Sequence, residues 1–175
     1  MHIILLSGWA ESGKDTCANY LAEKHDFKQF AFADSLKEEC SKLYNFPLSL
    51  TNSHEGKASF HLEKTIRQHL IDYANRQLQK NPYCFADEVA IKIQLGNYKK
   101  VVISDWRRID ELICLQQCFP TATIIPIRIQ RHLVSPIPDR SEYELHYPFR
   151  YIIENTKGKN ELYNALDDFI YKHSS

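Results

Sequence analysis

The sequence lacks net charge, paired cysteine motifs, internal repeats and low-complexity tracts. Lysine and arginine together number 22, the same as aspartate and glutamate. A chain without net charge has no overall electric field that would draw it to nucleic acid or to an anionic membrane. We therefore expect neither of these partners, and any binding of phosphate must depend on a local arrangement of groups.

The cysteines have neither the density of a disulfide scaffold nor the CxxC spacing of a zinc site. Their number is odd and their positions are scattered, which predicts reduced thiols and a cytoplasmic protein. The apolar residues 1–6 lead directly into Ser7 and Gly8 without a basic start, so we expect a core strand there rather than a signal peptide. The five cysteines are Cys17, Cys40, Cys84, Cys114 and Cys118.

The pattern of apolar residues predicts an α/β protein. A length of 175 residues suits one core and is short for two, so we expect one domain over residues 1–175. Short apolar runs alternate with longer amphipathic stretches, which is typical of a mostly parallel sheet with helices. Residues 45–59 and 130–141 fit neither pattern, and long irregular loops in a small domain are often functional. We predict strands at residues 3–7, 29–33, 101–104, 123–129 and 151–153, and helices at 14–23, 35–44, 62–74, 85–95, 109–117 and 162–170.

Residues 8–16 carry the pattern Gly-x-x-x-x-Gly-Lys-Asp-Thr between a predicted strand and a predicted helix. In this context the pattern predicts a P-loop, which wraps the phosphates of a nucleoside triphosphate with its backbone N–H groups. The helix N-terminus favours anions, and Lys14 reaches the outer phosphates. The motif narrows the fold to a three-layer P-loop NTPase fold, with a five-stranded sheet flanked by helices. The predicted nucleotide-binding residues are Gly8, Glu11, Ser12, Gly13, Lys14, Asp15 and Thr16.

Asp15 stands where Ser or Thr usually binds magnesium, and a hydroxyl follows only at Thr16. Carboxylate oxygens are ligands that Mg²⁺ accepts, either directly or through water. We therefore predict Asp15 and Thr16 as metal-binding residues. The alternative is that Asp15 caps the following helix.

The Gly-Lys-Asp-Thr sequence resembles the deoxynucleoside monophosphate kinases of phages and large viruses, and their relative, animal-type phosphomevalonate kinase. The similarity continues through Phe32-Ala33-Asp34-Ser35-Leu36-Lys37 and Ile103-Ser104-Asp105-Trp106-Arg107-Arg108. It then reaches Ser141-Glu142-x-Glu144-Leu145 and Tyr151-Ile152-Ile153-Glu154-Asn155, so the matches lie in order over nearly the whole chain.

The resemblance implies a nucleoside monophosphate kinase-like fold and transfer of the γ-phosphoryl group of ATP, with Mg²⁺, to a small phosphate-bearing acceptor. For a viral member it also implies the host cytoplasm as the location. Whether the protein forms a homodimer is left open by the sequence.

Such a transfer needs cations that hold the acceptor phosphate. Arg107 and Arg108 follow the strand 101–104, whose carboxyl end should lie beside the P-loop. The resemblance favours Arg107 for the acceptor, whereas Arg108 alternatively only caps a helix. Asp105 either orients magnesium or water, or pairs with Arg107.

The remaining acceptor residues are predicted in the helical region of residues 34–96. Lys37 lies in the helix after the second strand, and the family places an arginine similarly to Arg67. Arg76 follows nine positions after Arg67, which on a straight helix is half a turn away. Both arginines therefore face one pocket only if that helix breaks.

The segment of residues 130–141 is predicted to be a lid that excludes water from the transferring phosphate. It carries Arg131, His132 and Arg140, and it follows the strand with Arg128. We predict Arg128 and Arg131, together with Lys14, as catalytic residues. The alternative is an ordinary basic loop.

Three functions are consistent with these features. The first is a kinase of (deoxy)nucleoside monophosphates that uses Mg-ATP. The second is a phosphomevalonate kinase, which the local matches at residues 81–85, 104–108 and 153–155 also allow. The third is a nucleotide-dependent switch or ATPase without a small-molecule acceptor, and the sequence shows nothing similar to the usual switch segments.

Overall fold

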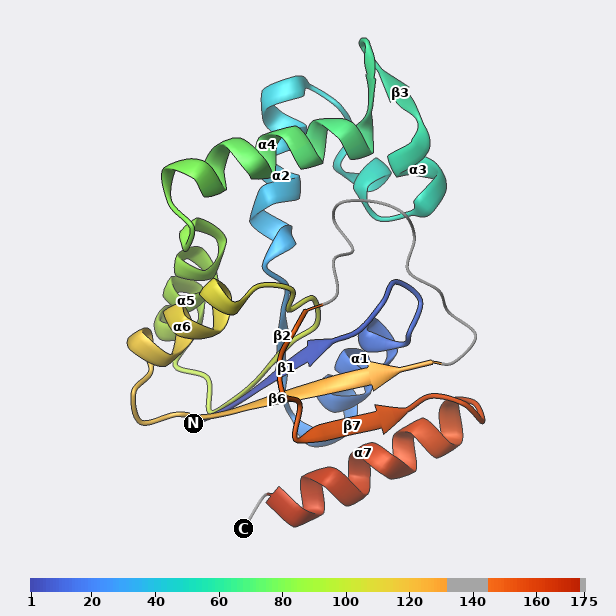
Figure 1. The fold of residues 1–175 in the computed structure, drawn as a ribbon, viewed down its shortest axis with the longest axis vertical. Helices are drawn as coiled ribbons and strands as arrows, with labels where there is room; N and C mark the ends of the chain where they lie inside the picture. Colours follow the sequence, from blue (N-terminus) through green and yellow to red (C-terminus); the bar gives the residue numbers. More distant parts are fainter. Residues whose placement is uncertain (132–144, 174–175) are drawn as a thin grey trace.

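A computed structural model describes residues 1–131 and 145–173 and shows a five-stranded parallel sheet between layers of helices (Figure 1). The strand order is β2-β5-β1-β6-β7, so β1 lies at the centre, paired in parallel with β5 and β6. This confirms the predicted α/β fold and its parallel sheet. The strands are β1 (His2–Ser7), β2 (Lys28–Phe30), β5 (Lys100–Ile103), β6 (Thr123–Gln130) and β7 (Tyr151–Glu154).

The sheet is buried on both faces, as parallel sheets usually are. Ile4 and Leu6 face one side and pack with α1 and α7, whereas Ile3 and Leu5 face the other side and pack with α5 and α6. All four side chains are at most 1% exposed. The helices of these layers are α1 (Lys14–His25), α7 (Lys159–His173), α5 (Cys84–Gly96) and α6 (Ile109–Cys118).

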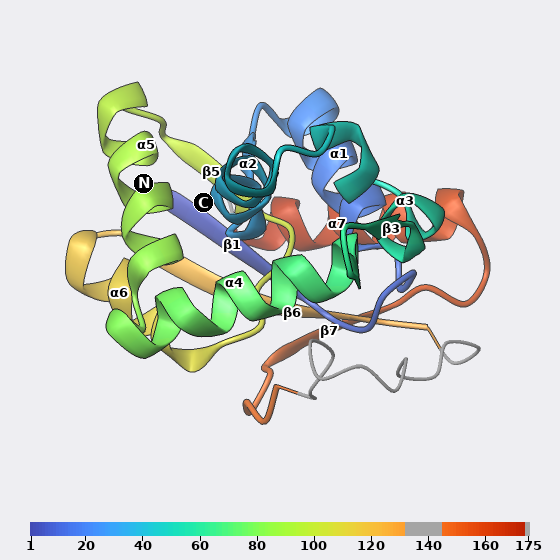
Figure 2. The ribbon, with the colours of Figure 1, turned by 90° about the horizontal axis from the view of Figure 1, so that it is seen from above.

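A second group of elements, residues 33–80, stands beyond one end of the sheet, and we call it the helical lobe (Figures 1 and 2). Its own small core consists of buried residues such as Phe46, Ile66 and Leu70. Its elements are α2 (Ala33–Tyr44), a 3-10 helix η1 (Leu48–Thr51), α3 (His54–Ala58), the hairpin strands β3 (Phe60–His61) and β4 (Lys64–Thr65), and α4 (Ile66–Lys80).

Two predicted boundaries, one in this lobe and one just before it, are wrong. The helix expected from residue 62 begins at Ile66, because Thr65 accepts a hydrogen bond from the Gln68 N–H and forms a capping box there. Leu62 instead lies in the hairpin with a positive φ of 57° and 74% exposure. The second strand ends at Phe30 rather than at residue 33, because α2 already begins at Ala33.

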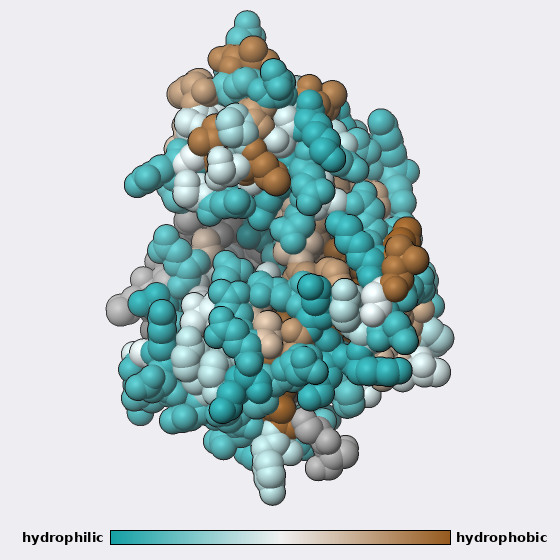
Figure 3. Space-filling model, turned by 180° about the vertical axis from the view of Figure 1, so that it is seen from behind, coloured by the Kyte–Doolittle hydropathy of each residue, from teal (hydrophilic) through white to brown (hydrophobic). Residues whose placement is uncertain are grey.

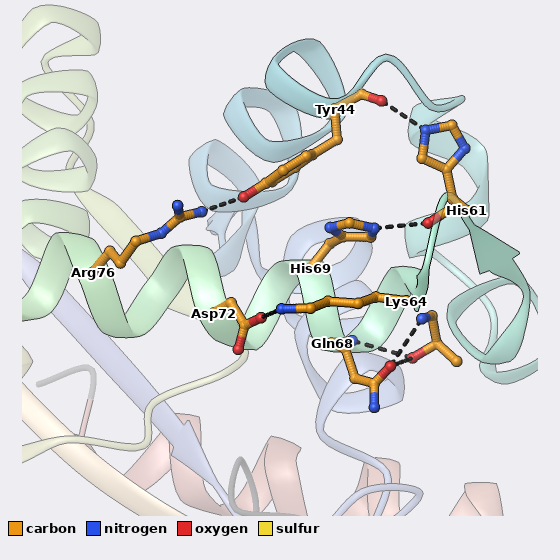
Figure 4. A network of polar contacts seen from close by, with 8 residues as sticks. Tyr44, His61, Lys64, Gln68, His69, Asp72 and Arg76 are labelled. Atoms are coloured by element: carbon orange, nitrogen blue, oxygen red, sulfur yellow. Dashed lines mark hydrogen bonds and ion pairs between the residues drawn. The ribbon is translucent and has the colours of Figure 1, made fainter.

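Polar contacts join α4 to α2 and to the hairpin (Figure 4). His69 is 6% exposed, and its Nε2 lies 2.9 Å from the His61 carbonyl oxygen. The Arg76 guanidinium donates to the Tyr44 hydroxyl, and the Lys64 ammonium pairs with the Asp72 carboxylate. Because α4 runs unbroken from residue 66 to 80, Arg76 belongs to this network, half a turn away from Arg67.

Hydrophilic side chains cover most of the back of the molecule, and hydrophobic ones gather near the far end of the helical lobe (Figure 3). None of the helices that the structure describes combines the length and the apolar character needed to cross a membrane.

Candidate active site

The P-loop joins β1 to α1 at the carboxyl end of the central strand, beside the helical lobe (Figure 1). Its backbone turns at Gly8, Glu11 and Gly13, whose φ values are 143°, 60° and 106°. A side chain at Gly8 would place its Cβ 2.3 Å from the Ile129 carbonyl oxygen. Only glycine therefore fits where the loop passes the neighbouring strand.

Lys14 and Ser12 point their polar atoms into this loop. The Lys14 ammonium donates to the carbonyl oxygens of Gly8 and Trp9, at 2.8 and 2.6 Å. Ser12 is 1% exposed, and its Oγ has no hydrogen-bond partner among the residues that the structure describes. A buried hydroxyl without a partner is costly in a folded protein. A phosphate oxygen in the loop would satisfy it, so the residues present fit the predicted ligand.

Asn155, directly after β7, fixes the loop from the side. Its Nδ2 donates to the Ser12 carbonyl oxygen at 2.9 Å, and its backbone N–H donates to the Gln130 carbonyl oxygen at 2.7 Å. The Cβ of an alanine at position 13 would lie 2.6 Å from this Nδ2. The sequence placed Asn155 in a family-like motif but did not indicate this supporting role.

Asp15 and Thr16 lie in the first turn of α1, next to the loop. The N-cap residue of α1 is Gly13, which has no side chain to cap the helix, and Asp15 lies two positions further on, inside the first turn. Asp15 is therefore not the helix cap that the alternative interpretation required. Its carboxylate is exposed and Thr16 is half-buried, so both offer oxygen donors of the kind that Mg²⁺ prefers. Metal binding by these residues stays a prediction.

Two arginines predicted for the lid lie against the P-loop. The Arg128 guanidinium lies 5.7 Å from the ring centres of Trp9 and Phe149, and Arg131 donates to the Glu11 carbonyl oxygen at 3.3 Å. Gln130 and Arg131 are the described residues of the predicted lid at 130–141; the rest, with His132 and Arg140, lies outside the described residues.

The turn after β5 connects the P-loop strand to the helical lobe. Both carboxylate oxygens of Asp105 accept backbone N–H bonds at the start of α2, from Phe32 at 2.8 Å and Ala33 at 2.9 Å. The backbone N–H of Trp106 donates to the Leu6 carbonyl oxygen of β1 at 3.1 Å. Burial raises the pKa of Asp105, and the two N–H bonds and the charges of Arg107 and Lys37 oppose that rise. Asp105 thus anchors α2 to the turn, while its predicted role toward magnesium or water stays untested.

Glu111 holds the two arginines of this turn through their backbone. Its Oε2 accepts the N–H groups of Arg107 and Arg108, both at 3.0 Å, and its side chain is 7% exposed. Burial raises the pKa of Glu111 to about 8. The Arg108 guanidinium pairs with Asp110 at 2.6 Å, beside the N-terminus of α6. The sequence did not indicate this role of Glu111, because a glutamate one turn after two arginines usually lies on an exposed helix surface.

Cations from separate elements gather around Lys57 of α3. Burial lowers the pKa of Lys57, the positive charges of Lys37, Arg67 and Arg107 lower it further, and the Asp15 carboxylate opposes them. Three of the four cations predicted for the acceptor, Lys37, Arg67 and Arg107, therefore lie near enough for their charges to act on Lys57, as does Asp15 of α1, whereas Arg108 pairs with Asp110. The sequence did not indicate Lys57, because the segment 45–59 was expected to be irregular, whereas the structure forms η1 and α3 within it.

Lys37 also lies 3.6 Å from the Asp34 carboxylate, one turn earlier in α2. This ion pair is half-exposed, so it contributes little to stability and leaves the ammonium accessible to other anions.

The comparisons with known proteins agree with this fold. The sequence matches no protein-family model and no curated protein. The structure is similar to a sugar kinase from a Janibacter species, with a TM-score of 0.51 and 11% identity over 97% of this chain and 94% of that chain. It is also similar to a protein from Chloroflexus aurantiacus provisionally named as a kinase, with a TM-score of 0.53 and 14% identity over 98% and 97% of the two chains.

Both likenesses extend over nearly the whole length of each chain. At these identities they establish the shared fold, an α/β fold with a parallel five-stranded sheet between layers of helices. Neither establishes which molecule this protein acts on.

Proposed function

We propose that this protein is a P-loop phosphotransferase that transfers the γ-phosphoryl group of Mg-ATP to a small molecule already bearing a phosphate, namely a (deoxy)nucleoside monophosphate. The observation that carries this proposal is that Lys37, Arg67 and Arg107 lie near enough to Lys57 for their charges to lower its pKa, with the Asp15 carboxylate of α1 opposing them. A neutral acceptor such as a sugar does not require so much positive charge, whereas a phosphate dianion does.

The donor side of the proposal rests on the P-loop. Its backbone turns, the buried Ser12 hydroxyl and the Lys14 ammonium suit the phosphates of ATP. Asp15 and Thr16 would hold Mg²⁺, which neutralises charge on the phosphates when bound. Arg128 and Arg131, which contact residues of the loop, add positive charge on the side of β6.

In the proposed reaction the chain mainly positions groups and neutralises charge. The four cations hold the acceptor phosphate so that one of its oxygens faces the γ-phosphorus. A bond forms between that oxygen and the γ-phosphorus as the bond to the β-phosphate oxygen breaks, and ADP leaves. Lys14 and the two β6 arginines stabilise the negative charge of the transferred group.

The test is ADP formation from ATP and Mg²⁺ with a panel of acceptors: the four deoxynucleoside monophosphates, their ribonucleotide forms and phosphomevalonate. Faster turnover with a nucleotide supports the proposal. Acceleration by phosphomevalonate alone favours that second acceptor, which the same cations would suit. Hydrolysis that no acceptor changes would support the switch or ATPase hypothesis instead.

Variants separate the donor site from the acceptor site. Lys14→Ala should abolish turnover, whereas Lys57→Ala and Arg107→Ala should lower acceptor kcat/KM about 10- to 100-fold and leave the KM for ATP nearly unchanged. The control is Lys92→Ala, which removes an exposed lysine of α5. Equal acceptor kinetics in Lys57→Ala and Lys92→Ala would contradict the assignment of this pocket.

A further inference from the structure

Three potential metal ligands meet between α5 and α6, and none of them is among the residues predicted for the candidate active site. Cys114 and Cys118 are one helical turn apart on α6, so their side chains share a face. Asp87 lies in the first turn of α5, and the Cys114 Sγ donates to its Oδ1 at 3.2 Å. One donor atom from each of the three residues lies within 4.8 Å of the other two.

These distances are close to those of a tetrahedral metal site. With bonds of about 2.3 Å to sulfur and about 2.1 Å to oxygen, neighbouring ligand atoms around Zn²⁺ lie about 3.6–3.8 Å apart. Because the three ligand atoms already lie within 4.8 Å of one another, they would have to approach by about 1 Å or less to bind the ion, which rotation of the side chains can supply. Cys114 is 3% exposed, whereas Cys118 and Asp87 are half-buried and keep part of their surface in contact with solvent.

Two features around the group favour a cation. Asn81 Nδ2 lies 3.2 Å from Asp87 Oδ2, which leaves Oδ1 turned toward the sulfur. Such an outer contact orients a ligating carboxylate in many metal sites. Cys118 is the last residue of α6, where the partial negative charge of the helix end favours a positive ion.

We propose that Cys114, Cys118 and Asp87 bind a thiophilic divalent cation of the Zn²⁺ class, with water as the fourth ligand. On binding, two S–H bonds break, two metal–sulfur bonds form and two protons leave to solvent, while Asp87 provides an oxygen lone pair. The ion would join α5 to α6, the two helices that flank β5 in the sequence and pack on the same face of the sheet. The scattered cysteine spacing gave no sign of this site, because its third ligand comes from another helix.

The experiment uses the reduced, chelator-treated protein in two titrations. Binding of Cd²⁺ is measured by the ultraviolet charge-transfer absorption of cadmium thiolates, and binding of Zn²⁺ is measured by calorimetry. We expect one ion for each chain. Cys118→Ser and Asp87→Asn, which change half-buried positions, should weaken binding by about 100-fold or more, since even outer-shell changes often cost 10- to 100-fold. Zn²⁺ should also raise the unfolding temperature of the unsubstituted protein and not that of Cys118→Ser.

The matched control is Cys84→Ser, which removes a half-buried thiol one turn before Asp87 on the same helix. It should bind Cd²⁺ as the unsubstituted protein does. Unchanged affinity in Cys118→Ser, or an equal loss in Cys84→Ser, would overturn the proposed ligand set. If the unsubstituted protein unfolds cooperatively, and is therefore folded, but binds neither Cd²⁺ nor Zn²⁺, the proposed site does not exist.

Discussion

Replacing Glu111 with glutamine should stabilise the protein at alkaline pH. The Glu111 carboxyl is nearly buried and accepts two backbone N–H groups, and its pKa rises from 4.5 to about 8 on folding. A folded pKa above the unfolded value means that the folded state keeps a proton which the unfolded chain has lost. The contribution of Glu111 to stability is therefore full below pH 4.5 and declines as pH rises through about 8.

The magnitude follows from the difference between these two pKa values. At about 1.36 kcal/mol per unit of pKa, this pKa difference corresponds to a decrease of up to about 5 kcal/mol in the free energy of unfolding between acid and alkaline pH. Glutamine keeps an oxygen that can accept the same two N–H groups, and it carries no charge at any pH. The Glu111→Gln protein should thus equal the unsubstituted protein near pH 5 and exceed it by several kcal/mol, about 3 to 5, at pH 9.

Urea unfolding at half-unit steps from pH 5 to 9 measures this difference. Glu38→Gln is the control, because it removes one carboxylate from an exposed position on α2. A difference between Glu111→Gln and the unsubstituted protein that stays flat with pH would refute the reasoning, because Glu111 would then carry the same charge in both states.

Two further predictions concern the P-loop and the core. Gly13→Ala should reduce the affinity for an ATP analogue at least 10-fold by calorimetry, because the new Cβ would lie 2.6 Å from Asn155 Nδ2. Gly158→Ala has the same φ of 106°, but its Cβ would make only an ordinary contact of 3.8 Å with Glu161 Oε2, so this variant should retain nucleotide binding. Leu166→Ala, at a position with no exposed surface, should lower the free energy of unfolding by about 3–5 kcal/mol. Leu95→Ala, at a position 83% exposed, should change it by less than about 0.5 kcal/mol in the same urea titration.

The sequence predicts the central part of this fold well, for a physical reason. Residues 3–6 and 101–103 are continuous apolar runs, as expected where both faces of a parallel sheet are covered, and residues 123–129 are mostly apolar; the structure pairs all three segments. The glycines and lysine of the P-loop form a contiguous pattern, so its position also follows from local sequence. The helix expected from residue 62 was placed too early because Leu62 matches the apolar period although it is exposed.

The contacts that organise the candidate site are not local, and the sequence did not predict them. Asp105 binds the backbone of residues 32 and 33, more than 70 positions earlier, and no side-chain pattern reveals a partner that is a backbone N–H. Lys57 lies in α3, and the cations that act on its charge, Lys37, Arg67 and Arg107, come from other parts of the chain. Arg67 and Arg107 could be proposed from resemblance, but their convergence needed the tertiary structure.

Phosphate and two carbonyl oxygens of the P-loop compete for the ammonium group of Lys14. Its ammonium is held by the carbonyl oxygens of Gly8 and Trp9, so an incoming phosphate has to displace groups of the protein itself. The net gain is the difference between a charge-assisted contact and the hydrogen bonds that are given up. A single weak anion has little advantage in that exchange, whereas a polyphosphate that also meets Ser12 and the backbone N–H groups has several. The lysine can thus act as a filter as well as a ligand, favouring polyphosphates over the isolated anions that surround every protein in solution.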